Sequence, residues 1–539
     1  MIIAQPRSLR PPGLSPDRDL VILPASRDNV SRVSADRPSR PPPSRHRFEL
    51  IACLALATMI VLLQAYIPLT FEQYFDSDQA VYGLMAKHLS EGRAFPLFFY
   101  GQNYLLGVQS WLAVPAFWIG GPTVAMLRTP LVLLNLSVAL GYTWTLARLG
   151  LRPAVAFAAA LPLIAFTPVK AMEFAAAYGA GIEPFLYVLI LWWLRGRALA
   201  FGALLGFGTL HREFTFLALP AMAIALWPVR VERTPAFLLR LAGGFGLVWL
   251  IVDVIKRQVN VYGPAGGIWE SGSVTLGAQT FVQWLSFDVA AYSARIATLL
   301  VRGVPDMLGA ATYSLRAYSF PSDLSVGTSS AGMLLAAAVV FAMGRLLWLR
   351  WREGGAPAGE LGRFAIYVAV VGVLNILLYG INGGIDPADA PVLRYALFAP
   401  LLIVALSARF FQRERARSWI VAVSACLVLW AAGNVVDNVR LIVDMKADPP
   451  PRSHRIMANY LLNHRIQYAR ANYWDAYVIT FLSAERVIVA STTTVRVAAH
   501  QAEVDAHADT AVTLVRQPCD QGVPVAAWCV VEPSVSPDR

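Results

Sequence analysis

The chain has 539 residues, of which 57% are hydrophobic and only 15% are charged. A soluble domain carries more charge, and many of the apolar stretches approach the thickness of a bilayer. The composition therefore excludes an ordinary soluble protein and predicts a polytopic α-helical membrane protein. The net charge of +11 does not indicate nucleic-acid binding, because the basic residues cluster in short loops between apolar runs, as the positive-inside rule expects.

The first 47 residues are rich in Pro, Ser and Arg and lack the apolar content that folding needs. We expect a disordered, basic, cytoplasmic tail here. Arg45 and Arg47 stand directly before the first apolar run, Leu50–Leu69, and place its start on the cytoplasmic side. Residues 70–123 then form a first outer loop, in which the short apolar run Leu105–Ile119 predicts a helix on the membrane surface.

The later apolar runs alternate with loops that carry arginine, and they predict about eleven transmembrane helices within residues 48–438. The predicted spans after the first are Val124–Leu146, Ala154–Thr167, Ile182–Leu194, a hairpin within Ala198–Val229, Phe237–Val252, Ala331–Leu349, Phe364–Tyr379, Tyr395–Leu406 and Trp419–Val436. On this count Pro168–Gly181 is an outer loop. Residues 253–330 form a large outer loop with surface helices, one of them near Val289–Val301.

The polar segment 439–539 has the size of a small domain, and the span count places it outside the cytoplasm. Ser453–Asn463 predicts a helix, whereas Ala476–Phe481 and Arg486–Ala490 are rich in Val and Ile and predict strands. We therefore expect a small extracytoplasmic (periplasmic) α/β domain at the C-terminal end.

The four cysteines are too few for a disulfide framework. Cys519 and Cys529 can pair if the C-terminal domain faces an oxidising compartment. The sequence shows no cluster of His and Cys with metal-ligand spacing, no phosphate-binding loop of the Walker type and no Ser/His/Asp signature. These patterns favour neither a nucleotide-dependent enzyme nor a serine hydrolase.

Two acids one residue apart, Asp76 and Asp78, follow the first span directly. A carboxylate at the membrane face can act as a general base towards a hydroxyl. A second carboxylate can orient the first, or hold a divalent cation such as Mg²⁺ or Mn²⁺. Acids are also common on ordinary solvated loops, so residue type alone decides nothing. The order of features, with Tyr82 and an amphipathic helix after the acids, favours a functional site.

The stretch FDSDQAVYGLMAKHL, followed by YGQNY and a surface helix that ends in WIGG, resembles the first outer loop of the GT-C glycosyltransferases. It is most similar to the family 39 branch of protein O-mannosyltransferases and lipid A aminoarabinose transferases. The resemblance covers the topology of the whole chain and the local sequence of about residues 71–148. The positions of Arg128 and Arg394 also resemble that family.

The resemblance implies a sugar donor linked to a polyprenyl phosphate and an acceptor that is a glycolipid, a polysaccharide or a protein. It implies Asp78 as the base and Asp76 as an alternate base or a cation ligand. Gln79 departs from the family pattern, which often has a glutamate there, and this weakens the case for a metal. Further substrate contacts are implied for Tyr82, Gln102, Asn103 and Tyr104. The expected location is the outer face of the bacterial inner membrane.

Several cations lie where a donor phosphate would bind. His211 and Arg212 interrupt an apolar hairpin, Arg394 begins a late span from the outer side, and Lys170 lies in an outer turn. An arginine can bind two phosphate oxygens at once. Each of these residues also has an ordinary structural reading, as a polar turn or as a snorkelling anchor.

Two other classes of protein fit the composition. A secondary transporter usually shows internal repeats and broken helices at the bilayer midplane, but this sequence shows no repeat, and its polar residues gather at one membrane face. A non-catalytic subunit of a polysaccharide-assembly system would use the outer domain for binding. It would not depend on Asp78.

Overall fold

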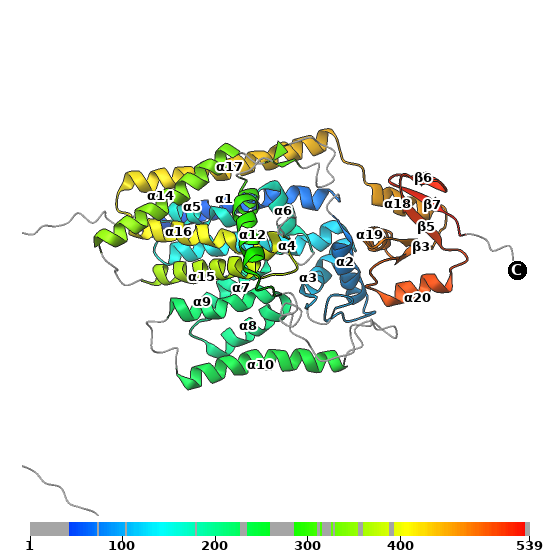
Figure 1. Ribbon diagram of the computed structural model, residues 1–539, viewed down its shortest axis with the longest axis horizontal. Coiled ribbons are helices and arrows are strands. Elements are labelled where there is room, and N and C mark those ends of the chain that lie inside the picture. The colour runs from blue at the N-terminus through cyan, green and yellow to red at the C-terminus, as the bar shows by residue number, and fades with distance from the viewer. Residues whose placement is uncertain are drawn as a thin grey trace, which may run out of the picture. The chain divides into compact units, whose positions relative to one another are not determined.

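The computed structural model describes residues 43–72, 75–102, 105–177, 181–226, 234–258, 285–309, 313–314, 325–326, 329–353, 359–386 and 393–533. Nearly all of the predicted tail and most of the predicted large outer loop lie outside these ranges. The described part is mainly helical, with a small mixed sheet near its C-terminal end (Figure 1).

Six of the described helices are long and apolar enough to cross a membrane. They are α1 (Pro43–Thr70), α4 (Val124–Arg148), α10 (Pro235–Gln258), α14 (Ser329–Glu353), α15 (Glu360–Gly380) and α17 (Arg417–Ala447). A seventh candidate is a bent pair, in which α5 and a 3-10 turn (Pro153–Leu163) meet α6 (Pro168–Ala175) at 79°. The chain is a polytopic helical membrane protein, as its composition predicts.

Shorter helices occupy the remaining predicted spans. They are α7 (Glu183–Leu194), α8 (Ala198–His211), η2 with α9 (Glu213–Leu217 and Ala218–Ala225) and α16 (Ala399–Arg413). Each of the eleven predicted spans therefore coincides with a helix or a helix pair. How many of them cross the bilayer stays a prediction, because the shorter helices fall below the length of a full span.

The prediction that Pro168–Gly181 is a loop is wrong for its first half, because α6 occupies Pro168–Ala175. Thr167 caps this helix and Pro168 occupies its first turn, a favourable start for a helix. The break before α6 leaves backbone carbonyls without helical partners. Amide side chains satisfy them: Asn434 donates to the Ala165 carbonyl (2.9 Å), and Asn438 donates to that of Phe166 (3.1 Å). The bend is thus supported from α17.

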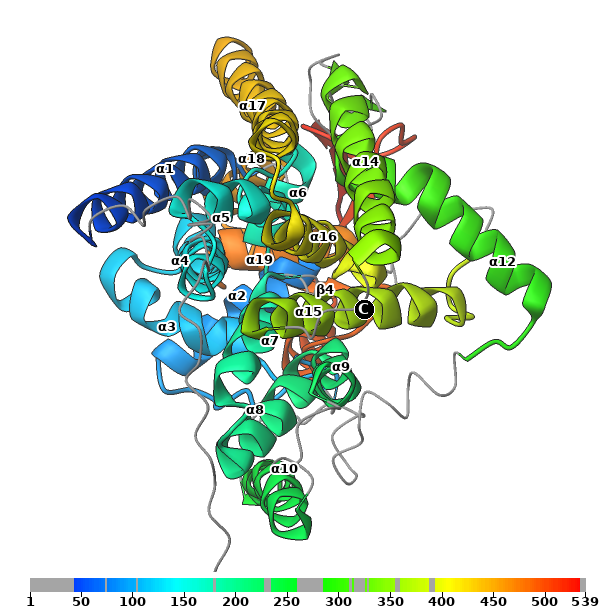
Figure 2. The ribbon, with the colours of Figure 1, turned by 90° about the vertical axis from the view of Figure 1, so that its left-hand side faces the viewer.

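Aromatic packing joins α7 to α15 in the helical core. Trp192 stacks on Tyr367 with ring centroids 5.6 Å apart and meets Phe364 edge-on at 5.2 Å. The Tyr367 hydroxyl donates to the Val188 carbonyl at 2.9 Å. Helices α8 and α10 lie side by side (Figure 2), where a Cβ atom on Gly202 would come within 2.0 Å of the Leu241 carbonyl oxygen. Small residues thus let these two helices approach closely.

Two short helices, α2 (Ser77–Ser90) and α3 (Val108–Gly120), lie between α1 and α4 in the chain. The helix predicted at Leu105–Ile119 is thereby confirmed. Arg128, which is buried, fixes the start of α2. It donates to the carbonyls of Pro68 (2.8 Å) and Phe71 (3.1 Å) and to the side-chain oxygen of Gln79 (3.0 and 3.1 Å). Gln79 therefore serves the fold as the acceptor for a buried arginine.

The region from Ser453 to Val531, named here the C-terminal subdomain, contains a five-stranded sheet. Its elements are α18 (Ser453–Asn463), β3 (Tyr468–Ala471), α19 (Tyr473–Leu482), β4 (Ile488–Ser491), α20 (Ala498–Ala506), β5 (Val512–Arg516), β6 (Val523–Val525) and β7 (Trp528–Val531). The strand order is β4-β3-β5-β7-β6, with β3 parallel to β4 and β5 and the other pairs antiparallel. A disulfide joins Cys519 to Cys529. The predicted α/β character is confirmed.

Two predictions for this subdomain are right and one is wrong. The helix at Ser453–Asn463 is confirmed, and β4 overlaps the predicted strand Arg486–Ala490. Ala476–Phe481 is helical, because it belongs to α19. Asn472 caps that helix by accepting from the Trp474 amide at 2.9 Å, and tertiary packing overrides the strand preference of Val and Ile.

Helix α19 packs directly against α2. The contact requires glycine at position 83, since a Cβ atom there would lie 2.5 Å from the Phe481 ring. Phe481 also meets Phe75, with ring centroids 5.2 Å apart. The C-terminal subdomain therefore rests on the helix that begins with the two acids.

The other described elements are short. They are α12 (Val289–Thr298), a π-helical turn (Leu299–Gly303), α13 (Val304–Met307), β1 (Tyr313–Ser314), β2 (Ser325–Val326) and η7 (Leu393–Ala396). Helix α12 confirms the helix predicted near Val289–Val301. Arg295 on α12 is buried and donates to the carbonyls of Ile385 (2.8 Å) and Gly380 (3.1 Å). It thus joins α12 to the end of α15.

Candidate functional site

The two acids at the start of α2 have different surroundings. Asp76 is the N-cap, and its Oδ1 accepts from the Gln79 amide at 3.0 Å. Burial raises the pKa of the Asp76 carboxyl to about 6. Asp78 lies in the first turn, is half-buried, and accepts a hydrogen bond from the hydroxyl of Tyr473. Asp76 is thus committed to the helix, and Asp78 projects from it.

Tyr82, one helical turn after Asp78, leads into a buried polar cluster. The cluster also contains Arg212 at the end of α8, Glu183 at the start of α7, and Gln109 on α3. Each of these four side chains is at most 3% exposed. Gln109 donates to Glu183 Oε1 at 2.5 Å, and Tyr82 lies within electrostatic range of Arg212, Glu183 and Asp78. We name these four residues the Arg212 cluster.

Several polar atoms of the Arg212 cluster have no hydrogen-bond partner among the described residues. They are Tyr82 Oη, Gln109 Oε1, Glu183 Oε2, and Arg212 Nε and Nη2. Native proteins pair the great majority of buried polar atoms, because an unpaired one costs on the order of 1–3 kcal/mol. A concentration of unpaired donors and acceptors is characteristic of a site that binds a polar ligand.

Other predicted site residues border this cluster. His211 is fully buried; its Nδ1 lies 2.8 Å from the Tyr187 hydroxyl, and its Nε2 has no partner among the described residues. Gln102 also has a buried Oε1 without a hydrogen-bond partner among the described residues. The backbone amide of Leu106 donates to the Leu210 carbonyl at 3.1 Å. This bond joins the segment after Gln102 to the end of α8.

The other predicted site residues either lie away from the Arg212 cluster or fall outside the described residues. Lys170 is 3% exposed, pairs with Glu173, and lines a small cavity beside Phe174. The backbone of Arg394 lies in η7, but its side chain is outside the described part, as are Asn103 and Tyr104. Their roles stay predictions.

A large apolar cavity of about 630 Å³ lies among α13, α14, α15 and α16, with Arg409 as a charged residue in its lining. Met307 and Leu308 line both this cavity and the small cavity of Lys170. The cavity offers almost only hydrocarbon surface. It is therefore suited to an apolar chain and not to a sugar.

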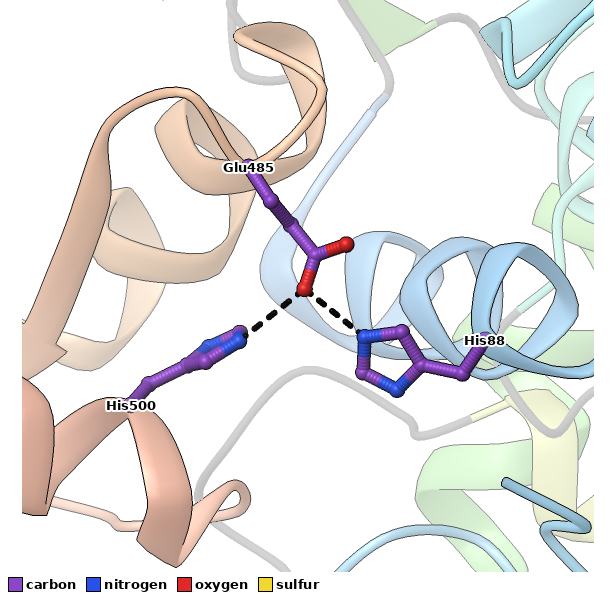
Figure 3. A group of neighbouring side chains, drawn as sticks. All are labelled: His88, Glu485 and His500. Carbon is purple, nitrogen blue, oxygen red and sulfur yellow. Dashed lines mark hydrogen bonds and ion pairs between the residues drawn. The ribbon is translucent and has the colours of Figure 1, made fainter. Parts of the chain in front are cut away.

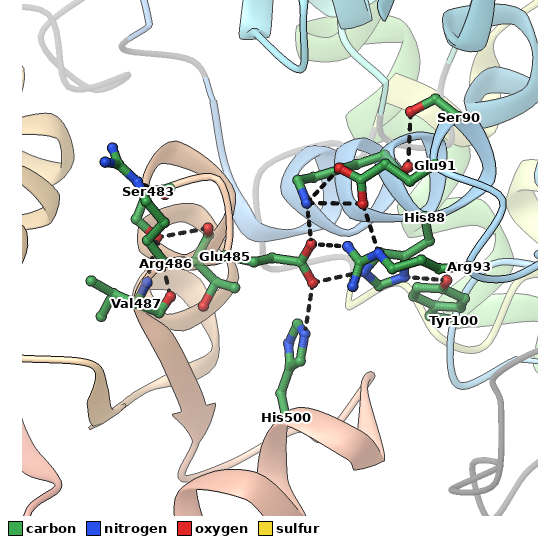
Figure 4. A network of polar contacts seen from close by, with 12 residues as sticks. His88, Ser90, Glu91, Arg93, Tyr100, Ser483, Glu485, Arg486, Val487 and His500 are labelled. Atoms are coloured by element: carbon green, nitrogen blue, oxygen red, sulfur yellow. Dashed lines mark hydrogen bonds and ion pairs between the residues drawn. The ribbon is translucent and has the colours of Figure 1, made fainter.

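A second buried polar group joins α2 to the C-terminal subdomain (Figure 3). Glu485 Oε1 lies 2.7 Å from His88 Nε2 and 3.2 Å from His500 Nε2. Its Oε2 accepts from Lys87 at 2.6 Å and from Arg93 (Figure 4). Burial opposes the charge of Glu485, but the bonds from His500, His88 and Lys87 hold its pKa well below the usual range. We name these five residues the Glu485 junction.

Backbone strain supports the placement of Glu485. Ala484 and Glu485 have φ angles of +56° and +62°. Residues other than glycine rarely adopt this left-handed region. The turn they form aims the Glu485 carboxylate at α2 (Figure 4). The cost of this turn is offset by the four contacts of the carboxylate.

His88, Glu485 and His500 offer ligand atoms within 4.8 Å of one another, and no other such group of three was found among the described residues. Two imidazoles and a carboxylate suit zinc better than Mg²⁺ or Mn²⁺, which prefer oxygen ligands. Lys87 and Arg93 already neutralise this carboxylate, and their charges oppose a divalent cation. The junction is better explained as a set of hydrogen bonds and ion pairs that holds the C-terminal subdomain against α2. Asp76 belongs to no such group within the described ranges.

Comparison with known proteins gives a fold. No protein-family model matches the sequence, and no curated protein matches it. Among solved structures, ArnT from Cupriavidus metallidurans in the apo state is 13% identical and aligns with a TM-score of 0.58, over 90% of this chain and 98% of that chain. The same protein bound to undecaprenyl phosphate is 12% identical with a TM-score of 0.53, over 86% and 92%.

An oligosaccharyltransferase from Archaeoglobus fulgidus in the apo form is more distant, at 14% identity and a TM-score of 0.40, over 82% of this chain and 64% of that chain. ArnT is a GT-C glycosyltransferase, and at this identity the likeness establishes the fold alone. The chain therefore has the GT-C fold, as its first loop and its topology predict.

Sequence reasoning missed part of this site. Glu183 and Gln109 carry no local motif, and the structure brings them to Arg212 from three different helices. Tyr473 lies far from Asp78 in the sequence, and its aromatic neighbourhood is the one signal that marks it. Contacts between distant segments of a membrane fold are not encoded in any spacing.

Proposed function

We propose that this chain is a glycosyltransferase of the inner membrane that moves a sugar from a polyprenyl-phosphate donor to an acceptor at the outer face. The observation that carries the proposal is the position of Asp78 next to the buried, incompletely paired Arg212 cluster. The GT-C fold supports it, and so does the undecaprenyl phosphate bound to the ArnT neighbour. The N-terminal end would be cytoplasmic and the C-terminal subdomain periplasmic.

In the proposed reaction the acceptor hydroxyl attacks the anomeric carbon of the sugar, and Asp78 takes the hydroxyl proton as general base. The new C–O bond forms while the bond from the anomeric carbon to the phosphate oxygen breaks, and the electron pair leaves with the polyprenyl phosphate. Arg212, assisted by His211, stabilises the charge on that phosphate. One such displacement inverts the anomeric centre.

The other residues of the site have supporting roles in this proposal. Tyr82, Gln102 and Gln109 offer hydrogen bonds to sugar hydroxyls, and Asn103 and Tyr104 follow in the same segment. Arg394 and Lys170 are further candidates for the phosphate. The apolar cavity of about 630 Å³ can accept part of the polyprenyl chain. A retaining course would need Asp76 as a nucleophile, but its Oδ1 caps α2.

A divalent cation such as Mg²⁺ or Mn²⁺ would add charge stabilisation at the phosphate if Asp76 and Asp78 held it. Asp76 and Asp78 offer oxygen ligands of the kind that such an ion prefers. The acceptor, which is a glycolipid, a polysaccharide or a protein in this proposal, is not distinguished by any described contact.

The test is turnover of a panel of radiolabelled polyprenyl-phosphate sugars by purified protein in lipid. We compare wild type with Asp78→Asn and Asp76→Asn, each checked for folding by thermal melting. Loss of a general base lowers the rate by roughly 10²–10⁴-fold, so we expect that loss in the first variant. Undiminished activity in a folded Asp78→Asn variant would remove Asp78 from the chemistry. Uptake of substrate into proteoliposomes without transfer would favour a transporter instead.

A further inference from the structure

Tyr473 connects the C-terminal subdomain to the proposed base. Its hydroxyl donates to Asp78 Oδ1, and the Ser77 hydroxyl donates to its backbone carbonyl. Burial, and then the charge of Asp78, raise the pKa of Tyr473 well above its usual range. The Tyr473 hydroxyl therefore stays protonated and remains a donor to Asp78 at every pH at which the protein works.

Tyr473 is held rigidly at this position. It opens α19, whose cap Asn472 fixes the first turn, and its ring meets those of Trp474 (5.0 Å) and Tyr477 (5.7 Å) edge-on. Helix α19 is in turn fixed to α2 by the packing of Phe481. A donor with so little freedom selects one orientation of the Asp78 carboxylate.

Arg496, in the loop between β4 and α20, reaches the same place. Its guanidinium lies 5.2 Å from the centre of the Phe99 ring and 5.8 Å from that of Tyr473. Its side chain lies over Gly101, which has a φ of +74° and whose added Cβ atom would be 3.2 Å from Arg496 Cδ. The glycine at position 101 thus leaves space for the Arg496 side chain beside Phe99.

The charge of Arg496 is only partly met within the described part of the chain. Its guanidinium hydrogen-bonds the side chain of Tyr473, whose hydroxyl in turn binds Asp78, whereas its buried Nε has no hydrogen-bond partner among the described residues. Aromatic faces hold its position but do not neutralise it. A guanidinium that is held by aromatic faces, keeps an unpaired N–H and lies near the reacting carboxylate is suited to bind an anionic group of a substrate.

We propose that the C-terminal subdomain completes the active site: Tyr473 positions Asp78 for proton transfer, and Arg496 binds a phosphate or carboxylate oxygen of a substrate beside it. This inference rests on the proposed function and adds two residues from a second part of the chain to it. Tyr473 then connects Asp78 to Arg496 of the C-terminal subdomain, and Tyr82 lies within electrostatic range of both Asp78 and Arg212 of the membrane helices. The transferase would be inactive without that subdomain.

The first test is Tyr473→Phe in the full chain in lipid, assayed with whichever donor the wild type turns over. Mispositioning of the base should lower kcat by about 10- to 100-fold and leave the donor KM unchanged. The control is Tyr468→Phe, which should match wild type. It removes the hydroxyl of a tyrosine in β3 whose ring stacks on His507.

A purely structural role for Tyr473 is separated by Ser77→Ala. This variant loses the bond to the Tyr473 carbonyl but keeps the Tyr473 hydroxyl, so it can lower stability without the loss of kcat. An unchanged kcat in Tyr473→Phe, in a preparation whose wild type is active, would overturn the inference and leave the proposed function intact. An inactive wild type across the donor panel would instead count against the proposed function.

Arg496→Gln identifies the anion. Binding of undecaprenyl phosphate, measured by native mass spectrometry, should weaken about tenfold or more if Arg496 holds the donor phosphate. If it holds an acceptor anion, that binding is unchanged, donor hydrolysis without acceptor continues, and the acceptor KM rises. Unchanged binding together with an unchanged acceptor KM would remove Arg496 from the active site.

Discussion

Two buried polar clusters meet on opposite parts of α2, and they differ in how completely their atoms are paired. In the Glu485 junction both oxygens of the carboxylate are bonded, to His88, His500, Lys87 and Arg93. In the Arg212 cluster five polar atoms lack a described partner. The Arg212 cluster is at most 3% exposed, whereas the Arg93 side chain of the Glu485 junction is 48% exposed. The more deeply buried cluster is therefore the less completely paired one, which is the pattern of a site that binds a ligand and not of a joint that holds the fold.

The largest expected effect is on the paired cluster. Glu485→Ala removes the carboxylate that binds both imidazoles and leaves Lys87 and Arg93 with the more exposed Glu91. Removing one partner of a buried ion pair costs about 3–5 kcal/mol. We expect a correspondingly lower free energy of unfolding, measured by denaturant titration in detergent. Glu91→Ala is the matched control, because Glu91 contacts the same Lys87 but its side chain is 40% exposed, so about 0–1 kcal/mol is expected.

If Glu485→Ala melted like Glu91→Ala and lost donor binding instead, the junction would be part of the binding site. The comparison between the two clusters would then fail.

A smaller, pH-dependent effect is expected at Asp76. Its pKa is about 6 in the folded chain against an ordinary value of 3.8 for an aspartate, so the folded state binds the proton more tightly. Stability contributed by this group is complete below about pH 4 and is lost as the pH rises through 6. Asp76→Asn removes the charge but keeps a side chain that caps a helix equally well.

Thermal melting of the Asp76→Asn variant against wild type should therefore show a stabilisation of about 1–3 kcal/mol at pH 7.5 that disappears near pH 4. If the difference in stability between variant and wild type were constant across this pH range, the surroundings of Asp76 would not favour its uncharged form.

The smallest expected effect on stability is in the unpaired cluster. Tyr82→Phe removes a buried hydroxyl that interacts with Arg212 but makes no well-aligned hydrogen bond among the described residues, so the free energy of unfolding should change by only about 1 kcal/mol or less. Donor binding should still weaken, by about three- to tenfold, because the lost hydroxyl is offered to the ligand. A clear loss of stability together with unchanged binding would mean that this hydroxyl serves the fold.

The helices and the acid pair could be predicted from the sequence because their signals are local. Apolar runs between arginine-bearing loops mark the spans, and the order Asp76, Asp78, Tyr82 marks the first loop. The strand predicted at Ala476–Phe481 failed because Val and Ile serve a helix equally well when both of its faces are buried. The loop predicted after Pro168 failed because a capped helix can resume immediately after a break.

The composition of the site could be predicted only in part. Arg212 was suggested by its place in an apolar hairpin, since an uncompensated charge there needs a reason. Glu183 and Gln109 had no such mark, because their function depends on neighbours from α8 and α2. Tyr473 and Asp78, which are in contact, are separated by 395 positions in the sequence. Only the folded arrangement of the C-terminal subdomain on α2 reveals it.

The central claim is that the unpaired cluster binds the donor phosphate and the paired cluster does not. The direct test is the affinity for undecaprenyl phosphate of wild type, Arg212→Gln and Arg93→Gln in lipid nanodiscs, each first shown to be folded by melting. A lost charge-assisted hydrogen bond is worth about 1.5–3 kcal/mol, or roughly 10- to 100-fold in affinity. We predict that loss for Arg212→Gln and an affinity within about twofold of wild type for Arg93→Gln. Equal affinities of wild type and Arg212→Gln, or an equal loss in both variants, would contradict the account.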